Sequence, residues 1–249
     1  MISSINIFGI PVSQGTYELF LNSFLQRAKE RKSSYALFMN SHMVYEAKCN
    51  AIFRNVIKNA DYICPDGVPL LYASRIFGDN SYERVAGNDM IFSILQLAEK
   101  ESLRVFFYGS TEQVLNIISK RLDSEYGSLN YKCYSPPFRK LTDVELHNHA
   151  EIINEYGANI VLVGLGCPKQ EIWMEKMKPT VEALMLGVGG AFPLFAGIDT
   201  RAPLIVRRLA LEWVYRWVLE PKRLFKRYLV TNTYFCYLFI KELVKKILK

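Results

Sequence analysis

A chain of 249 residues fits one compact domain with room for a small appendage, and it is long enough to bury a sizeable core. Half of the residues are hydrophobic, 22% are charged and 13% are aromatic, a composition that excludes disordered, low-complexity and collagen-like chains. The formal net charge of +7 would suggest a nucleic-acid partner if it were evenly spread, but it is not.

Short apolar runs rich in β-forming residues alternate along the chain with longer stretches of helical periodicity. The runs predict strands at residues 5–10, 35–39, 62–64, 104–108, 159–163 and 183–188. The stretches predict helices at residues 16–31, 41–60, 88–100, 111–125, 142–156 and 168–177. This alternation predicts an α/β fold with a Rossmann-like, mainly parallel sheet and helices on both faces. Ligands of such sheets bind beyond the carboxyl ends of the strands.

The positive charge gathers after residue 200, which marks the predicted boundary between a body (residues 1–200) and an appendage (residues 201–249). The appendage has twelve Lys or Arg and three Glu, a net charge of +9, whereas residues 1–200 have 19 basic and 21 acidic side chains. Aromatic residues lie between the cations, a pattern that suits an anionic membrane surface. The longest uncharged stretch of the appendage, residues 228–240, is too short to span a bilayer.

The chain end is predicted to be an amphipathic helix, because Lys241, Lys245 and Lys249 recur at four-residue spacing. We interpret residues 201–249 as a basic, aromatic-rich, helical appendage that associates with a membrane. The alternative is a helix packed on its own domain with a solvated lysine stripe. Nucleic-acid binding is not expected, since no known nucleic-acid-binding motif accompanies the basic residues.

Cysteine spacing and the first residues bear on the compartment. None of the five cysteines falls in a CxxC pair, and the opening residues lack the basic flank and long apolar run of a secretory signal. Reduced thiols in the cytoplasm are therefore predicted.

Four loops that follow predicted strands carry polar or glycine-rich sequence. Asn40 ends one strand before a helix-capping Ser, and Asp66 lies on a tight turn after another. Residues 164–171 (GLGCPKQE) and 187–192 (GVGGAF) are glycine-lined. Because glycines let backbone amides approach a phosphate, these two loops predict a cradle for a diphosphate. Ordinary turn geometry explains Pro-Asp-Gly and strand-end glycines equally well.

Several patterns that mark other chemistries are absent. Neither glycine loop completes GxGxxG, because Lys169 and Phe192 occupy the third-glycine positions, which weakens a dinucleotide-binding reading. No HExxH, GxSxG or Cys–His arrangement is present, and no metal site is predicted. His147 and His149, two residues apart on a predicted helix, are expected at the surface.

An ordered set of segments resembles the WecG/TagA/CpsF family of bacterial glycosyltransferases, whose fold is called GT-E. The segments span the chain from about residue 5 to 228, and the ordered set is specific although no single piece is. They are Asn40 with the following helix, 61–67 (DYICPDG), 75–78 (RIFG), 83–89 (ERVAGND), 104–110 (RVFFYGS), 164–171, 187–197 (GVGGAFPLFAG), 201–203 (RAP), 211–213 (LEW) and 220–223 (EPKR).

The resemblance implies an inverting, metal-independent and cofactor-free enzyme. It would move a sugar, of N-acetylmannosamine type or a hexose, from a UDP-sugar to a sugar linked by a diphosphate to an undecaprenyl lipid. The product would be a capsule, an exopolysaccharide or a teichoic acid. The expected location is peripheral, on the cytoplasmic face of the plasma membrane, and a homo-oligomer is left open.

The resemblance also implies roles for individual residues. Asp66 matches the proposed catalytic base, which takes the proton of the acceptor hydroxyl. Arg84 matches an arginine that contacts substrate or diphosphate, and Asn40 and Gln170 match polar residues of the same cavity. The other expected substrate-binding residues are Asp89, Gly109, Gly164, Gly166, Lys169, Gly187, Gly189, Gly190, Arg207, Arg216 and Arg223.

Two other functions stay open on the residues alone. One is a Rossmann-type enzyme with a nicotinamide or adenosine cofactor, and the other is a non-catalytic scaffold that binds membranes.

Overall fold

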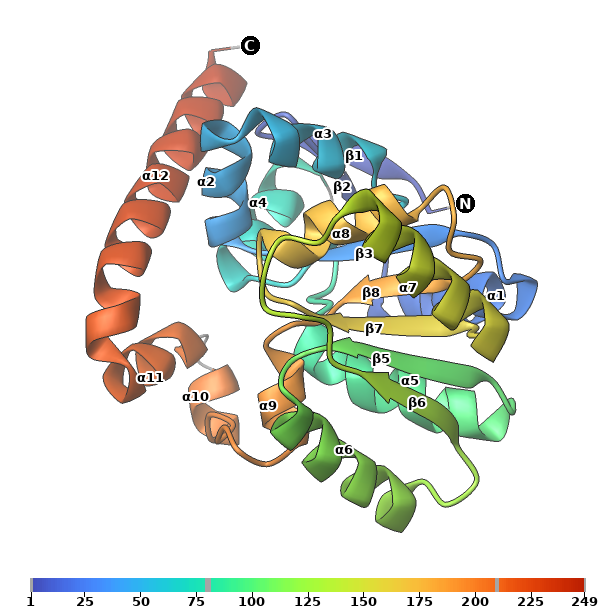
Figure 1. The fold of residues 1–249 in the computed structure, drawn as a ribbon. Coiled ribbons are helices and arrows are strands. Elements are labelled where there is room, and N and C mark those ends of the chain that lie inside the picture. Colours follow the sequence, from blue (N-terminus) through green and yellow to red (C-terminus); the bar gives the residue numbers. More distant parts are fainter. Residues whose placement is uncertain (1, 79–81, 209–210, 249) are drawn as a thin grey trace.

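The computed structural model describes residues 2–78, 82–208 and 211–248, and its centre is a six-stranded sheet in which every strand is parallel to its neighbours (Figure 1). The strand order is β4-β3-β8-β7-β5-β6. The strands are β3 (Ser34–Met39), β4 (Tyr62–Pro65), β5 (Arg104–Gly109), β6 (Asn130–Tyr134), β7 (Ile160–Gly164) and β8 (Leu184–Gly187). Every residue of β3, β4 and β8 is buried, as expected for a parallel sheet covered on both faces.

Helices cover both faces of this sheet, as predicted. One face packs against α1 (Tyr17–Glu30), α5 (Gly87–Lys100), α6 (Glu112–Glu125) and the short α9 (Ala191–Phe195). The other packs against α2 (Ser41–Cys49), α3 (Ala51–Asn59), α4 (Val68–Phe77), α7 (Asp143–Tyr156) and α8 (Lys169–Met177). Alternate residues of β3 serve the two cores, since Tyr35 and Leu37 face one while Ala36 and Phe38 face the other.

The first predicted strand is wrong. Residues 5–10 do not form one strand of the main sheet but belong to a separate antiparallel hairpin, β1 (Ser4–Ile7) and β2 (Ile10–Ser13). Phe8 and Gly9 take positive φ angles of 55° and 84° and turn the chain, and the Gly9 amide donates to the Asn6 side chain over 2.8 Å. An apolar run across a two-residue turn looks continuous in sequence, because Phe8 is itself apolar.

Three other elements differ from the prediction. The helix expected at 41–60 is broken at Asn50, whose extended backbone ends α2 and whose side chain caps α3 by accepting from the Phe53 amide. Helix α4 was not predicted; it begins beside Pro69, which suits a first helical turn. Edge strand β6 was also missed, because its exposed positions Asn130 and Lys132 interrupt the apolar pattern.

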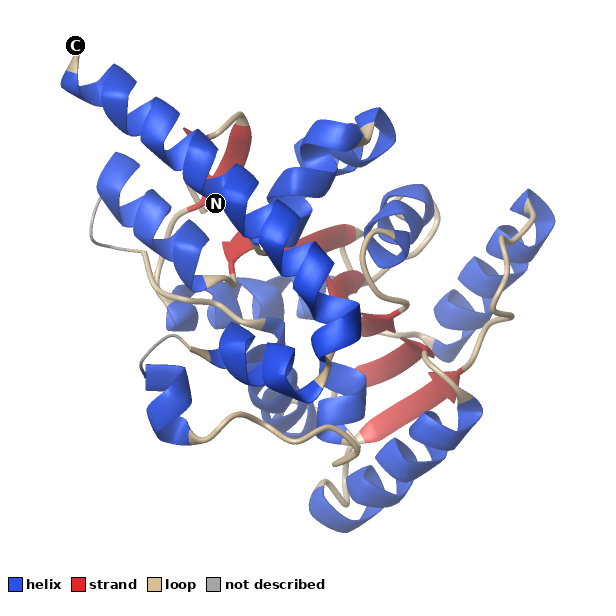
Figure 2. Cartoon of the chain, turned by 90° about the vertical axis from the view of Figure 1, so that its left-hand side faces the viewer, coloured by secondary structure: helices blue, strands red, loops and turns tan. Residues whose placement is uncertain are grey.

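The C-terminal segment is helical, as predicted, and consists of α10 (Leu204–Arg208), α11 (Glu212–Leu219) and the long α12 (Pro221–Ile247). One side of α12 packs on the body alongside α2 (Figures 1 and 2). Phe235 is 5% exposed and its ring meets Phe8 at 5.3 Å between centroids, while Tyr234 meets Tyr45 at 5.5 Å. The alternative interpretation, a helix packed on its own domain, therefore holds for this side.

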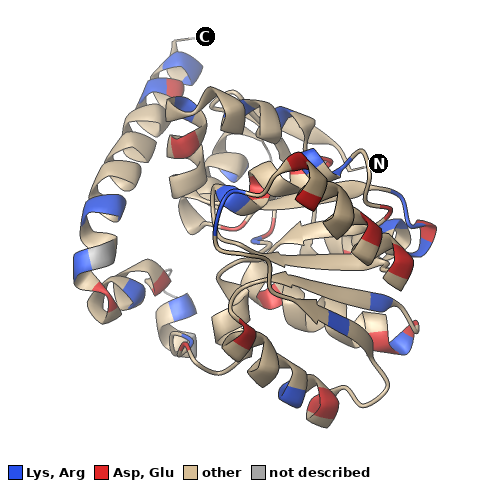
Figure 3. Ribbon diagram, viewed as in Figure 1, with Lys and Arg blue, Asp and Glu red and all other residues tan. Residues whose placement is uncertain are grey.

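The opposite side of α12 is apolar and uncovered. Five side chains there are between 47% and 73% exposed and fall within an arc of about 100° on a helical projection: Phe225, Leu229, Ile240, Val244 and Ile247. Lysines and arginines lie toward both ends of the helix with an uncharged middle (Figure 3). The helices of the described residues include none with both the length and the hydropathy of a membrane span.

Candidate active site

The loops that follow β3, β4, β7 and β8 meet at the carboxyl edge of the sheet. Asp66 comes directly after β4, and its amide donates to the carbonyl of Met39, the last residue of β3, over 3.0 Å. Asn40 follows Met39 and caps α2, with Oδ1 accepting from the amides of His42 at 3.1 Å and Met43 at 3.3 Å. Gly67 packs on Asn40, and a Cβ at Gly67 would lie 3.2 Å from that of Asn40. The sheet thus places Asn40 and Asp66 side by side, although the Asn40 oxygen is already engaged.

Arg84 joins Asp66 to the C-terminal segment. Its Nε donates to the Asp66 carbonyl over 2.8 Å, and its Nη2 lies 3.6 Å from the Asp66 carboxylate. The same Nη2 donates to Oε2 of Glu212, on α11, over 3.0 Å. The three side chains are 21% to 28% exposed, so they are largely covered but can still be reached from solvent.

The pKa of Asp66 is raised to about 7, and burial is the main cause. Arg84 opposes the shift, Glu212 and Asp89 add to it, and Arg216 opposes it. A carboxyl group with this pKa exchanges a proton near neutral pH, which is the property required of a general base.

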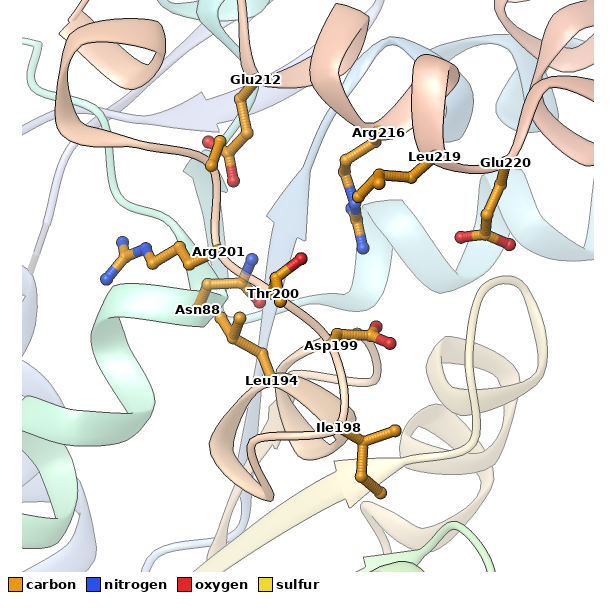
Figure 4. A pocket seen from close by; sticks show the side chains of 12 residues that line it. Asn88, Leu194, Ile198, Asp199, Thr200, Arg201, Glu212, Arg216, Leu219 and Glu220 are labelled. Atoms are coloured by element: carbon orange, nitrogen blue, oxygen red, sulfur yellow. The ribbon is translucent and has the colours of Figure 1, made fainter.

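A pocket of about 230 Å³ opens beside this cluster, between the body and α11. The body contributes Asn88 from α5, Gly190 from the loop after β8, and residues 198–202, while α11 contributes Glu212 and Arg216 (Figure 4). Arg216 has no hydrogen-bond or ion-pair partner within the described ranges, and a Cβ on Gly190 would lie 3.7 Å from its Nη2. The pocket therefore holds a guanidinium that is free to meet an anion.

Arg201, which lines this pocket, forms a salt bridge with Asp89. Asp89 is in the first turn of α5, and Arg201 is in the link between the body and α10. This pair fixes the start of the C-terminal segment against the body, so the Asp89 carboxylate is not free.

The two glycine loops are held together by Gln170. Its Oε1 accepts from the amides of Gly166 and Gly189, both at 3.1 Å, and its Nε2 donates to the carbonyl of Gly187 at 3.1 Å and to Glu171 at 2.8 Å. Gln170 is 6% exposed, and these four bonds satisfy its amide. Two of the amides expected in a diphosphate cradle are consequently taken by a side chain of the protein.

The expected substrate-binding glycines fall into two groups. A Cβ at Gly109, Gly164, Gly187 or Gly189 would come within 2.5 to 2.7 Å of neighbouring atoms, so these glycines permit close packing of the loops. Gly166 and Gly190 are different, because a Cβ would meet nothing within 4 Å at the first and only Arg216 at the second. Of the six, these two face open space.

Glu171, next to Gln170, is a buried carboxyl that sequence reasoning did not single out. It is 1% exposed, one oxygen accepts from Gln170, and the other has no partner among the residues described. Burial raises its pKa to about 7, and the bond from Gln170 only partly offsets the shift.

The remaining expected site residues are dispersed. Lys169 is exposed at the start of α8, and Nε of Arg207 donates to the Ala202 carbonyl over 3.1 Å. The side chain of Arg223 lies outside the described residues. Glu212 was missed as a site residue, although it stands in the quoted segment 211–213.

The prediction for His149 is wrong, because this side chain is only 6% exposed. Its two ring nitrogens lie 2.8 Å from the Tyr108 hydroxyl and 2.9 Å from the Tyr134 hydroxyl, and burial lowers its pKa. The helix face that carries His149 therefore turns inward, whereas His147 is exposed and lies 3.4 Å from Glu151.

Three His, Cys, Asp or Glu side chains that could share a metal ion are not found together in the part of the chain that the structure describes.

Comparisons with known proteins agree on one family. The sequence profile of the Glycosyl transferase WecG/TagA/CpsF family matches residues 5–248. An N-acetylglucosaminyldiphosphoundecaprenol N-acetyl-beta-D-mannosaminyltransferase of Bacillus spizizenii is 31% identical over 78% of this chain and 74% of its own length. The proteins of that name from Bacillus subtilis (31% identity, 74% of this chain, 71% of theirs) and Staphylococcus aureus (29%, 74% and 72%) are similar to it as well.

Proposed function

The chain belongs to the WecG/TagA/CpsF family of glycosyltransferases, and on that premise we propose that it transfers a sugar from a UDP-sugar to a sugar carried on a lipid diphosphate, with Asp66 as the base. Of the functions left open by the residues, this transfer is the one that the family supports. The observation that carries the proposal is the Asp66 carboxyl, with its pKa of about 7, beside a pocket lined by Arg216, which has no ion-pair partner among the described residues.

The acceptor class follows from the relatives. Their names specify an undecaprenyl-diphosphate-linked N-acetylglucosamine as acceptor and N-acetylmannosamine as the sugar moved. For this chain we carry over the class, a polyprenyl-diphosphate-linked sugar, and leave the transferred sugar as an N-acetylhexosamine or hexose. The product belongs to a surface polysaccharide or teichoic acid.

The reaction is a single displacement with inversion. Asp66 takes the proton from a hydroxyl of the acceptor sugar as that oxygen bonds to the anomeric carbon of the donor. The bond between this carbon and the diphosphate oxygen breaks on the opposite face, and UDP leaves with the electron pair. Asp66 must be ionised to act, so turnover rises with pH through about 7.

The leaving diphosphate develops negative charge that must be neutralised. Arg216 is the guanidinium placed for this role, since it projects into the pocket and matches phosphate geometry with a fork of donors (Figure 4). The Gly190 backbone and the Asn88 side chain line the same pocket. In this proposal these groups do what a metal ion does in other transferases.

The uncovered side of α12 supports peripheral binding to the inner face of the plasma membrane. Its exposed apolar stripe includes Phe225 and Leu229, and Lys222 and Lys226 are exposed on the same part of the helix. Such a face inserts its rings and aliphatic side chains at the headgroup level while its cations meet anionic lipids. A lipid-linked acceptor would then be presented at the edge of the sheet.

Substitution of the base tests the function. We expect Asp66→Asn to lose turnover on a short-chain lipid-diphosphate sugar while keeping its thermal midpoint and its calorimetric affinity for UDP. The matched control is Asp143→Asn, an exposed carboxylate on α7, which should behave as the wild type. Near-normal turnover in Asp66→Asn, or a wild type that binds NAD and not UDP, would contradict the proposal.

A further inference from the structure

A carboxylate of the C-terminal segment shares a guanidinium with the proposed base. Glu212, on α11, accepts a hydrogen bond from Nη2 of Arg84 at 3.0 Å, and Asp66 lies 3.6 Å from the same nitrogen. Only the first of these distances is a hydrogen bond.

The Arg84 side chain has little freedom to choose between the two acids. Its Nε is anchored on the Asp66 carbonyl at 2.8 Å, which fixes the guanidinium beside the Asp66 carboxylate. A shift of about 0.8 Å would turn the 3.6 Å contact into a charge-assisted hydrogen bond of about 2.8 Å. What opposes this shift is the bond to Glu212.

We propose that Glu212 is a positioning residue: from the docked C-terminal segment it holds the Arg84 guanidinium away from the Asp66 carboxylate, so that this carboxylate stays free to accept the proton of the acceptor. The inference rests on the proposed function of Asp66. It assigns the C-terminal segment a part in tuning the base, in addition to covering the site.

The charged groups around Asp66 act on its carboxyl in both directions. Arg84 and Arg216 favour ionised Asp66, while Glu212 and Asp89 disfavour it. The Cys64 thiol, on β4 itself, is buried and its pKa is raised, so it stays neutral. Asp89 is paired with Arg201, which leaves Glu212 as the acid that acts through Arg84.

Docking of the C-terminal segment sets the position of Glu212. Helix α11 continues through Glu220 into α12, and α12 is held on the body by Phe235, which is 5% exposed. Glu212 therefore reaches Arg84 when α12 is docked. If α12 leaves the body, Arg84 is released to Asp66 and the base is weakened.

The test is the pH dependence of kcat/KM for the donor, measured on the full chain with a short-chain acceptor. In Glu212→Ala we expect the acidic limb to move to lower pH by about one unit, because Arg84 closes on Asp66 and a negative charge is lost. The plateau rate should fall about threefold, because a base of lower pKa is weaker. Glu212→Gln, which keeps an oxygen for Arg84, should move the limb by less.

Controls separate positioning from folding. Glu242→Gln removes a carboxylate of α12 that pairs with Lys245, away from the site, and should leave the limb unmoved. If the limb keeps its position in both Glu212 variants, or moves to higher pH, the inference is wrong, whatever the rate. If instead Asp66→Asn retains the wild-type limb, the limb belongs to another group and the proposed base itself fails.

Discussion

Gln170 offers a direct test of how the glycine loops are built. The resemblance implies that this side chain contacts substrate, but in the structure its amide makes four hydrogen bonds within the protein. It bonds the amides of Gly166 and Gly189, the carbonyl of Gly187 and the carboxyl of Glu171. Replacing it with Ala removes all four bonds at a position that is 6% exposed.

The expected loss of stability in Gln170→Ala can be worked out from these four hydrogen bonds. Each buried polar group left unsatisfied costs about 1–3 kcal/mol, and water entering from the open side at Gly166 would replace part of the loss. We therefore expect Gln170→Ala to lower the free energy of unfolding by about 3 kcal/mol. Because the two loops also lose their mutual register, affinity for UDP should fall in the same variant.

Urea unfolding at pH 7 and calorimetry with UDP measure the two effects on the same preparation. Gln113→Ala, an exposed glutamine on α6, is the matched control and should change neither quantity. A Gln170→Ala protein that binds UDP poorly while its unfolding free energy stays within about 0.5 kcal/mol of the wild type would refute the reasoning. Gln170 would then bind the substrate directly and would not serve to hold the two glycine loops together.

Three further results are expected. The folded protein holds the proton of Glu171 up to about pH 7, above the ordinary carboxyl range, so this residue makes stability fall as pH rises from 5 to 8. Urea unfolding of Glu171→Gln should show a decline smaller by about 2 kcal/mol, and an unchanged slope would contradict the assigned pKa. Phe235→Ala should weaken docking of α12, seen as faster tryptic cleavage there, and should move the acidic limb of kcat/KM in the same direction as Glu212→Ala. Reversing Lys222 and Lys226 to Glu should cut sedimentation with anionic vesicles, most strongly at low salt, whereas equal sedimentation would count against the membrane-facing side of α12.

Sequence patterns predicted the central sheet well, and the reason is physical. Five of its six strands are buried on both faces, so each appears as an apolar run bounded by polar residues, and the observed ends differ from the predicted ones by at most one residue. Local turns and helix breaks were harder to predict from the sequence. The turn at Phe8 and the break at Asn50 each depend on one residue whose side chain does not interrupt the surrounding pattern.

The candidate site also has features that could be predicted from the sequence and features that could not. Loops at the carboxyl edge of a parallel sheet can be located from sequence, and Asp66, Asn40 and the glycine loops were found there. Whether a glycine faces a ligand or a neighbouring side chain cannot be read from its position. Gly164 and Gly190 both follow strands, yet a Cβ would lie 2.6 Å from Phe192 at the first and 3.7 Å from Arg216 at the second. Long-range pairs such as Arg84 with Glu212, 128 residues apart, become visible only in the fold.

These contacts explain why charged residues of the C-terminal segment matter for the candidate site. Arg216 of the C-terminal segment lines the pocket, and Glu212, one turn earlier on the same helix, pairs with Arg84 beside the proposed base. In the proposed mechanism, one helix supplies both the cation for the leaving diphosphate and the carboxylate that keeps the base available, and residues 1–200 carry neither of these two groups. An enzyme built this way is complete only while α11 is in place. If the outer side of α12 rests on the membrane that holds the acceptor, the surface that presents the substrate also favours the position of α11 in which Glu212 reaches Arg84.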